Sequence, residues 1–576
     1  MRTTYPEAYF NFIDVTALTD SKAVALTAKD FADTALLKKD IRQKEYGTME
    51  LNQFVLDGSR EIFPADAPED VPYFSDEKSD ENRHYAYNPI LEITFRKAHS
   101  SIGLTLHFAS DIPAEIEIIW YTLSGTKLIS ETFYPDAAEY FCENNVQNYG
   151  KITIEFTKSA WPYRYAKLDY IEYGRMWLLG TDNIKAASVY EELDITGATL
   201  SINTAQIDII DTDNRFELSN HDGLWKAFQK EQRIAITEFV NGRPVDCGSF
   251  YLDDWSCQKN IVKFAMVDII GLMDKTQYYG GTVYKGEPAG NIIDSIMASC
   301  GVKEYSVEEE IRETRLSGWL GIMSHRQALQ QVVFACEAVA DCSRIAGVRL
   351  YRPDRYVSHT IGLDRKFQGT KITLLEYVSA VRVAFYDYVP EEKESQISKS
   401  ILPAGRTKVE FKNPFVVESI QASAGSIVEK TENYAVISME QSGECILSGR
   451  KYEEKAGAYT ASVQHLEAGE TAKTKEYKGC TLMDLKKAKE VAEYILDYLQ
   501  LRQEIDMRYI NEGECVGNWC NVEQTGGVQS VTGITGQTLD LTGGNLASAK
   551  CRGYSRTATS DYFAGGELYA GEEGIV

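Results

Sequence analysis

The residues most able to do acid–base or metal chemistry are scattered along this chain of 576 residues. Histidine is a common general base and metal ligand, and the chain has seven, at positions 84, 99, 107, 221, 325, 359 and 465. None has a second histidine or a cysteine at the spacing of a metal-ligand motif. His107 shares a strand pattern with Leu104 and Leu106, which favours ring packing in a half-buried sheet over catalysis.

Recognisable catalytic motifs are also missing from the sequence. It contains no HExxH metalloprotease motif, no GxSxG elbow, no phosphate-binding Walker A loop and no dinucleotide-binding GxGxxG. Paired carboxylates are expected by chance in an acidic chain, so they do not nominate a glycosidase. We therefore predict no enzyme activity, no metal and no cofactor.

The cysteines indicate free thiols rather than a disulfide framework. They are 11 in number, odd and widely spaced, which is typical of a protein made in a reducing cytosol. The closest pairs, Cys515/Cys520 and Cys336/Cys342, lack the doubled CxxC of a zinc ribbon.

Two further groups of residues allow a binding reading beside a structural one. The stretch 211–214 (Asp-Thr-Asp-Asn) superficially resembles a calcium loop, but Phe216 and Asp222 stand where that loop needs Gly and Glu, so we predict an Asx-type turn. Four aromatic residues could stack on sugar rings, although core packing explains most such aromatics in a β-sandwich. These candidate glycan contacts are Trp120, Tyr121, Trp161 and Tyr163.

The composition describes an acidic globular protein. Sixty Lys and Arg face 85 Asp and Glu, giving a formal net charge of −25. Such a balance argues against general binding to nucleic acid, because phosphates need a basic surface. The N-terminus has no apolar stretch typical of a signal peptide, and no run of 18 apolar residues predicts a membrane span.

Most of the chain has the alternating pattern of β-strands. Residues 90–95, 103–108, 114–120, 151–156 and 165–173 each alternate inward and outward positions, which predicts a β-sandwich. A second β unit begins near Ile184, and Asn241-Gly242 between two strand patterns is its strongest hairpin signal. Helical periodicity is convincing at 288–301, 324–336 and about 481–503, with Ser324 as the N-cap of the second helix.

The order of several segments is more informative than any motif. Residues 191–194 are followed by 201–203, 208–211 and Phe216, and 248–252 by 264–272. Residues 324–329 and 342–344 then lead into a strand at 347–351, and helix 481–503 precedes 517–522 and 533–535. This order resembles the tail hub proteins of long-tailed bacteriophages. The part from 58 to 174 resembles the sandwich that precedes the hub in prophage tail proteins of Gram-positive hosts.

The resemblance implies a mainly β fold, in which an N-terminal sandwich precedes two tube-like β-barrels carrying helix-containing α+β inserts. The domains expected from it are an N-terminal segment 1–57, a jelly-roll-like sandwich 58–180, a first hub barrel 181–284, an α+β insert 285–365, a second barrel from 366–410 and 504–556, a second insert 411–503 with the long helix, and a flexible tail 557–576.

The resemblance also implies a function. It implies a structural, trimeric ring at the tail tip or baseplate, located in the virion and assembled in the host cytoplasm. The implied partners are other copies of the chain, tail-tube and distal-tail proteins, the tape-measure protein, and receptor-binding or fibre proteins. Genomic DNA would pass through the lumen unbound, and an acidic surface there would repel phosphates.

Two other classes stay open at this point. A surface or virion carbohydrate-binding protein is suggested by the sandwich and its aromatics. A cell-wall hydrolase or endopeptidase is suggested by the peptidoglycan-cleaving domains that often follow the hub in this family; because the sequence ends at Val576, we expect no such domain here.

Overall fold

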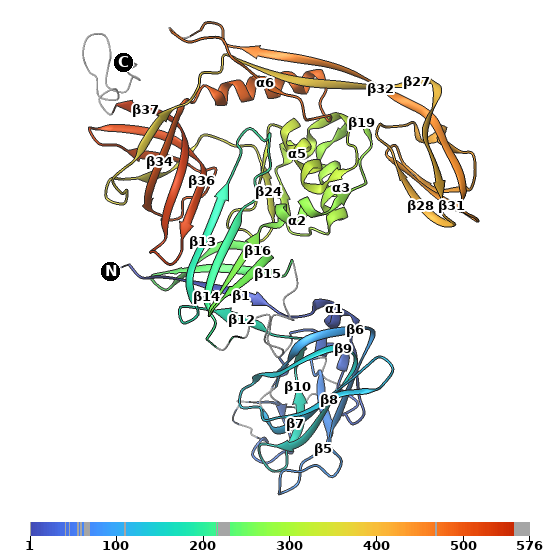
Figure 1. Ribbon diagram of the computed structural model, residues 1–576. Coiled ribbons are helices and arrows are strands. Elements are labelled where there is room, and N and C mark those ends of the chain that lie inside the picture. Colours follow the sequence, from blue (N-terminus) through green and yellow to red (C-terminus); the bar gives the residue numbers. More distant parts are fainter. Residues whose placement is uncertain are drawn as a thin grey trace.

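The computed structural model describes the chain apart from residues 1, 41, 45, 55–56, 58–59, 63–69, 109–110, 213, 215, 217–230, 467–468 and 558–576. The predicted mainly β class, with helices confined to a few short segments, is confirmed. Figure 1 shows most of the helices gathered between a large sheet, a projecting β arm and an N-terminal β domain, whereas α1 lies in that domain. His221 lies outside the described residues, as does nearly all of the predicted flexible tail.

The centre of the molecule is one sheet of 13 strands. In hydrogen-bonded order its main path is β12 (Met176–Leu179), β1 (Thr4–Asn11), β15 (Arg233–Val240), β16 (Arg243–Gln258), β17 (Ile261–Val267), β14 (Thr204–Ile210), β13 (Ile184–Glu192), β36 (Val528–Asp540), β37 (Leu546–Thr557), β34 (Gln503–Ile510) and β26 (Lys371–Leu374). Off this path, β25 (Val357–Ile361) pairs with β35 (Trp519–Glu523), which pairs with β36. Strands β12 and β26 are therefore the two ends of the path.

The segments predicted to form two barrels contribute strands to two halves of this one sheet. The first half runs from β12 to β13 and the second contains β25, β26 and β34–β37. They join where β13 pairs with β36, over Ser188↔Asp540 to Glu192↔Gly536. The other part of β36 pairs with β35, from Trp519↔Gly533 to Glu523↔Gln529. A single strand thus belongs to both parts of the sheet, with a register shift between Ile534 and Gly536 where its partner changes.

Most of the segment expected in the second barrel forms a different structure. The range 366–410 was predicted to belong to that barrel, but only its strand β26 is part of the large sheet. The 23-residue β27 (Ala380–Leu402) instead pairs with the 20-residue β32 (Gly443–Ser462). Alternation along a strand shows which side chains share a face but not which strand lies beside it.

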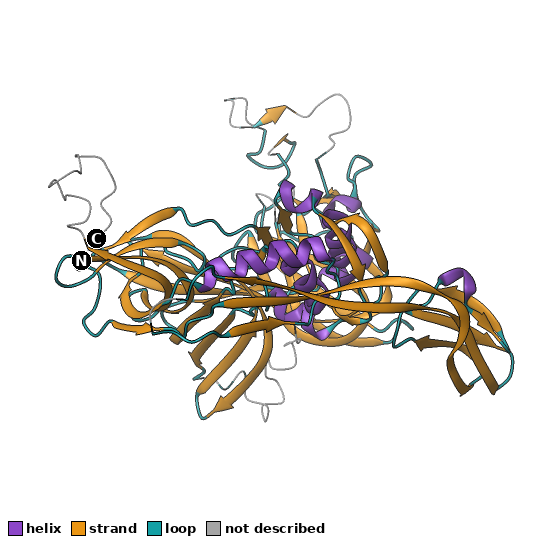
Figure 2. Cartoon of the chain, turned by 90° about the horizontal axis from the view of Figure 1, so that it is seen from above, coloured by secondary structure: helices purple, strands orange, loops and turns teal. Residues whose placement is uncertain are grey.

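Strands β27 and β32 form an arm that extends beyond the helices, as Figure 2 shows. At about 3.3 Å per residue, the strands reach up to roughly 75 Å. The arm carries a small lobe with its own apolar core. The other elements of the arm and lobe are β28 (Gly405–Glu410), η3 (Val417–Ser419), β29 (Gln421–Ala422), β30 (Ser426–Lys430), β31 (Tyr434–Met439) and β33 (Thr474–Tyr477).

The three predicted helices are confirmed as α3 (Ala289–Cys300), α5 (His325–Ala335) and α6 (Leu485–Leu499). Ser324 caps α5 in a capping box with Gln327. Around them lie α2 (Ile269–Lys275), β18 (Gln277–Tyr278), β19 (Val283–Pro288), β20 (Tyr305–Val307), α4 (Glu309–Glu313), β21 (Arg315–Trp319), β22 (Met323–Ser324), β23 (Val339–Asp341) and β24 (Val348–Tyr351). No helix in the described part of the chain is long and apolar enough to cross a membrane.

The N-terminal β domain packs a six-stranded sheet against a two-stranded one around a separate core. The larger sheet contains β2 (Lys22–Ala25), β6 (Ile90–His107), β7 (Pro113–Tyr121), β8 (Lys127–Phe133), β9 (Glu139–Ser159) and β11 (Tyr170–Glu172), and the smaller one β5 (Tyr73–Lys78) and β10 (Tyr165–Leu168). Beside them are α1 (Val15–Asp20), η1 (Thr34–Lys38), β3 (Tyr46–Gly47) and β4 (Glu61–Ile62). The expected N-terminal segment 1–57 is therefore divided, since β1 joins the large sheet whereas α1, β2 and η1 accompany the sandwich.

A narrow neck connects the sandwich to the large sheet. Two chain crossings make it, and they hydrogen-bond to each other: Phe12 N donates to Arg175 O and Asp14 N to Tyr173 O, both at 2.9 Å. The large sheet, the helices and the root of the arm share one continuous apolar core, whereas the sandwich has its own. The neck therefore determines how the sandwich is positioned relative to the large sheet.

Gly174 in the neck should be intolerant of a side chain. Its φ is +133°, and a Cβ there would lie 1.9 Å from the carbonyl oxygen of Phe12. We expect Gly174→Ala to destabilise the protein by about 2–4 kcal/mol and to make the neck susceptible to limited proteolysis. The control is Gly180→Ala, where a Cβ meets nothing within 4 Å. Equal proteolysis patterns in the two variants would contradict this account of the neck.

Candidate functional site

The most distinctive surface feature is the pair of free edges that end the main path of the sheet. Among the described residues, β12 pairs only with β1 and β26 only with β34; β25, which ends the side branch, pairs only with β35. The β12 and β26 edges carry exposed apolar side chains. Each edge exposes two large apolar side chains two residues apart, which places them on one face of the strand: Met176 (51%) and Leu178 (45%) on β12, and Ile372 (48%) and Leu374 (66%) on β26. Free edges with apolar side chains are templates for pairing with another chain.

More apolar surface flanks the β26 edge. Tyr356, Leu363 and Phe367, in and around the segment that leads from β25 to β26, are also exposed. Several large apolar side chains exposed on neighbouring segments are typical of interaction surfaces in soluble proteins. The arrangement is therefore suited to association with another protein surface.

A buried polar network connects the two halves of the sheet where β13 and β36 join. Arg344, from the loop after β23, donates to Glu191 Oε1 of β13 at 3.0 Å and to the carbonyl oxygen of Glu514 at 2.6 Å. Gln537 of β36 donates to Glu191 Oε2 at 2.7 Å. Glu191 is only 1% exposed. The helical insert and both halves of the sheet thus meet at one charge pair.

The network continues on the side of the second half. Arg365 contacts Glu514 Oε1 at 2.5 Å, and Tyr509 Oη donates to Gln537 Oε1 at 3.1 Å. Burial works against the charge of Glu514, but the hydrogen bond from Arg365 offsets it and lowers the pKa of Glu514 below its usual value. Fully partnered buried networks of this kind fix a unique arrangement of the elements that share them.

Glu238 of β15 lies near this network, but the network does not provide all the hydrogen bonds that its carboxylate could accept. Its Oε1 is buried and has no hydrogen-bond partner, and burial raises the pKa of Glu238 to about 7 against the opposing charges of Arg2 and Arg344. The folded protein therefore holds this proton more tightly than the unfolded chain does. Binding of this proton therefore stabilises the folded protein fully at pH values below the ordinary glutamate pKa. This stabilisation is lost as the pH rises through about 7.

Glu238→Gln should remove this pH dependence. We expect the free energy of unfolding at pH 8 to rise by up to roughly 3 kcal/mol, with little change near pH 4.5. Urea unfolding at the two pH values measures the difference. Glu444→Gln, an exposed residue paired with Lys399, is the control, and a pH profile unchanged by Glu238→Gln would contradict the assignment.

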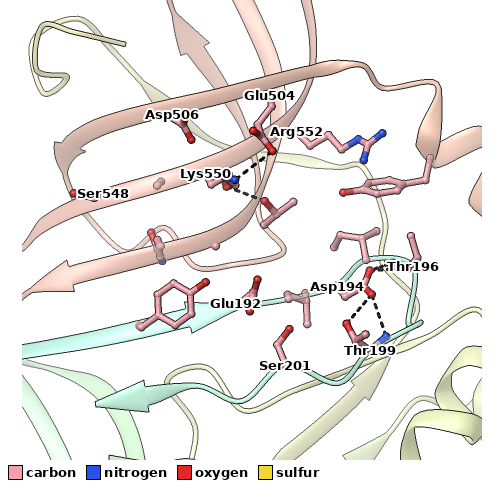
Figure 3. A pocket seen from close by; sticks show the side chains of 18 of the residues that line it. Glu192, Asp194, Thr196, Thr199, Ser201, Glu504, Asp506, Ser548, Lys550 and Arg552 are labelled. Atoms are coloured by element: carbon pink, nitrogen blue, oxygen red, sulfur yellow. Dashed lines mark hydrogen bonds and ion pairs between the residues drawn. The ribbon is translucent and has the colours of Figure 1, made fainter. Parts of the chain in front are cut away.

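A hollow of about 990 Å³ lies between the two halves, where β13, β34 and β37 meet the loop at 194–201. Figure 3 shows Asp194 and Lys550, two of its charged side chains, joined to neighbouring side chains. Asp194 accepts from Thr196 and Thr199, Lys550 lies 3.5 Å from Glu504, and Arg552 donates to the carbonyl oxygen of Leu501 beyond the end of α6. These contacts are typical of a structural junction rather than of a nucleophile paired with a base.

The other predicted sites have local roles or stay untested. Among the described residues, no group of three His, Cys, Asp or Glu side chains is placed to hold a metal ion. The carboxylate of Asp211 accepts from Phe216 N at 2.9 Å, five residues further on, which is not the two-residue spacing of an Asx turn. Asp213 and Arg215 lie outside the described residues, so the predicted turn stays a prediction. His107 packs 5.2 Å from the Tyr170 ring and 3.4 Å from Glu172.

The four candidate glycan contacts do not lie together. Trp120 is completely buried in the sandwich core, so a sugar at the surface cannot stack on it; this residue is withdrawn from the prediction. Tyr121 pairs with Lys151 in the middle of β9, whereas Pro113 pairs with Ser159 at its C-terminal end. Trp161 follows that end, so Tyr121 lies roughly 26 Å away from it along the strand. Trp161 and Tyr163 are exposed on one loop.

Neither the free edges nor the junction was predicted from the sequence. The alternating apolar residues of 176–179 and 371–374 were a usable signal for strands, but the face they expose depends on partners far away in sequence. Glu191 and Arg344 are 153 residues apart, and no local pattern links them.

Several solved structures are similar to this chain at very low sequence identity. The tail protein from Neisseria meningitidis MC58 matches 65% of this chain and 93% of its own, with 9% identity and a TM-score of 0.41. Prophage tail protein gp18 from Listeria monocytogenes EGD-e matches 67% and 93%, with 8% identity and a TM-score of 0.37. No protein-family model and no curated protein matches the sequence. With TM-scores below 0.5, these likenesses by themselves assign neither family nor function.

Proposed function

We propose that this chain is a structural subunit of a phage tail tip, a hub that assembles head to tail into a closed ring. The observation that carries the proposal is the 13-stranded sheet, in which β12 and β26 end the main path, have one neighbour each among the described strands, and expose apolar side chains. If β12 of one copy pairs with β26 of the next, the sheet continues from chain to chain. Such heterologous contacts close into a ring when the rotation between copies is right.

Three copies are proposed because the sheet has two halves. A trimer then presents six similar pieces of sheet, which suits a sixfold tail tube stacked on it, as in the hub family that the sequence resembles. The fused halves must keep one geometry for the ring to close, and the buried Arg344–Glu191 network supports that rigidity.

The acidic composition suits a channel for DNA. Three chains at −25 each would make the ring strongly negative, and carboxylates facing the lumen would repel phosphates and let DNA pass without binding. The sandwich and the arm project from the sheet and are proposed to contact distal-tail, tape-measure and fibre proteins. The hydrolase alternative has no specific structural observation in its favour.

The mass of the purified protein in solution tests the ring. Light scattering over a concentration series should give about three times the 64.7 kDa of one chain. A mass of one chain at every concentration, together with no binding to tail-tube or distal-tail proteins, would contradict the proposal.

A further inference from the structure

The sandwich carries one tryptophan that its fold does not bury. Trp161 lies in the short loop between β9 and β10 and is 65% exposed. A tryptophan side chain gains most of its stabilising effect from burial, and the loop lies at the end of β9 opposite the end that is paired next to the neck. Folding of the sandwich therefore gives no reason for an exposed indole here.

Buried serines fix the backbone beneath this indole. Ser159 Oγ lies 2.7 Å from both the carbonyl oxygen of Trp161 and Ser79 Oγ, and Arg164 N donates to Ser79 Oγ at 3.0 Å. Both serines are almost inaccessible to solvent. A loop that is already ordered loses little conformational entropy when it binds a ligand.

The same loop contains an unfavourable backbone conformation. Tyr163 has φ = +58°, in the left-handed region that costs a bulky L-residue about 1–2 kcal/mol. Its ring is partly exposed, with Lys78 Nζ 5.9 Å from its centroid. Strain retained on an exposed aromatic loop is typical of a binding loop rather than of a simple connection.

Hydrogen-bonding side chains lie on the neighbouring loop. The loop at 80–84 is bound to the loop that carries Trp161, because Tyr163 N donates to Asp80 O at 3.4 Å and Ser159 N to Arg83 O at 3.0 Å. Asp80, Asn82 and His84 on that loop are exposed. One flat apolar ring beside polar side chains matches a sugar, whose C–H face packs on an aromatic ring while its hydroxyls exchange hydrogen bonds. A protein partner would need about 800 Å² of surface per side.

We propose that the loops at 80–84 and 159–164 form a glycan-binding site, in which Trp161 stacks on a pyranose ring of a polysaccharide and the polar side chains of 80–84 bind its hydroxyls. Tyr163 borders the same sugar. The site needs only one chain, so it is independent of ring assembly, and Trp120 and Tyr121 have no part in it.

The test uses the full-length protein on an array of oligosaccharides built from N-acetylglucosamine, glucose, galactose and rhamnose pyranoses. Wild type should bind at least one of them, and Trp161→Ala should weaken that binding at least tenfold. Trp161→Phe keeps an aromatic face and should retain part of it. Tyr121→Ala removes an aromatic ring beside the middle of β9, away from the Trp161 loop, and should stay within twofold of wild type.

Thermal unfolding of each variant shows whether the sandwich is intact. No binding of wild type to any arrayed glycan would overturn the proposal. So would binding that Trp161→Ala leaves unchanged, or that Tyr121→Ala weakens as much.

Discussion

Arg344→Ala should destabilise the protein by about 3–5 kcal/mol, the usual cost of removing one partner from a buried ion pair. The substitution leaves the carboxylate of Glu191 buried, with Gln537 as its remaining hydrogen-bond donor. It also removes the bond to Glu514 O that connects the helical insert to the second half of the sheet. The shift in the urea midpoint for unfolding of the large sheet measures the loss.

Two companion variants distinguish a buried charge from a general packing defect. Arg355→Ala removes an ion pair with Asp497 that is exposed on both sides, and should cost less than about 1 kcal/mol. Combining Arg344→Met with Glu191→Gln removes both charges and should recover much of the stability lost in Arg344→Met alone. If the double variant is no more stable than the single one, the charge pair is not what holds the halves together.

Replacing Ile372 and Leu374 of β26 with lysine should abolish ring formation. Lysine on an edge strand blocks pairing with another chain, and two apolar contacts are lost at each junction. We expect association to weaken at least 100-fold, about 3 kcal/mol, so that light scattering reports single chains. Ile401→Lys with Val428→Lys adds the same charges to exposed positions of the arm and lobe and should leave the ring intact.

The β12 edge gives a reciprocal variant. Met176→Lys with Leu178→Lys should also give single chains. In a mixture of the β12 and β26 variants, each chain keeps one good edge, so one junction forms and assembly stops at two chains. Trimers in either variant alone would contradict the edge-to-edge account, and so would a mixture that stays entirely monomeric.

The sequence predicted single elements where particular residue types have strong local conformational preferences. Asn241 and Gly242 adopt φ of 51° and 77° in the predicted hairpin turn, and Ser324 caps α5 as expected. The burial of Trp120 was also readable, because it alternates with Ile116 and Ile118 on one face of β7. Its use as a glycan candidate overlooked that period of two.

Features that depend on pairing between strands far apart in the sequence could not be predicted in this way. The alternating pattern around 380–402 is compatible with a barrel strand or an arm, and only the partner, β32, decides between them. Similarly, β1 and β12 come from either side of the sandwich in sequence yet pair in the 13-stranded sheet. The candidate interface could not be predicted from the sequence, because a strand forms an edge only when no other strand pairs with one of its two sides.

Chemical crosslinking across the proposed junction tests the central claim most directly. The variant Leu178→Cys with Ile372→Cys carries one exposed thiol on each edge, whereas the chain's own cysteines are buried or half-buried. With a bis-maleimide reagent, a head-to-tail ring of three predicts covalent dimers and trimers and no longer products, and neither single variant should crosslink. A double variant that stays monomeric, or one whose products extend well beyond three chains, would contradict the closed ring.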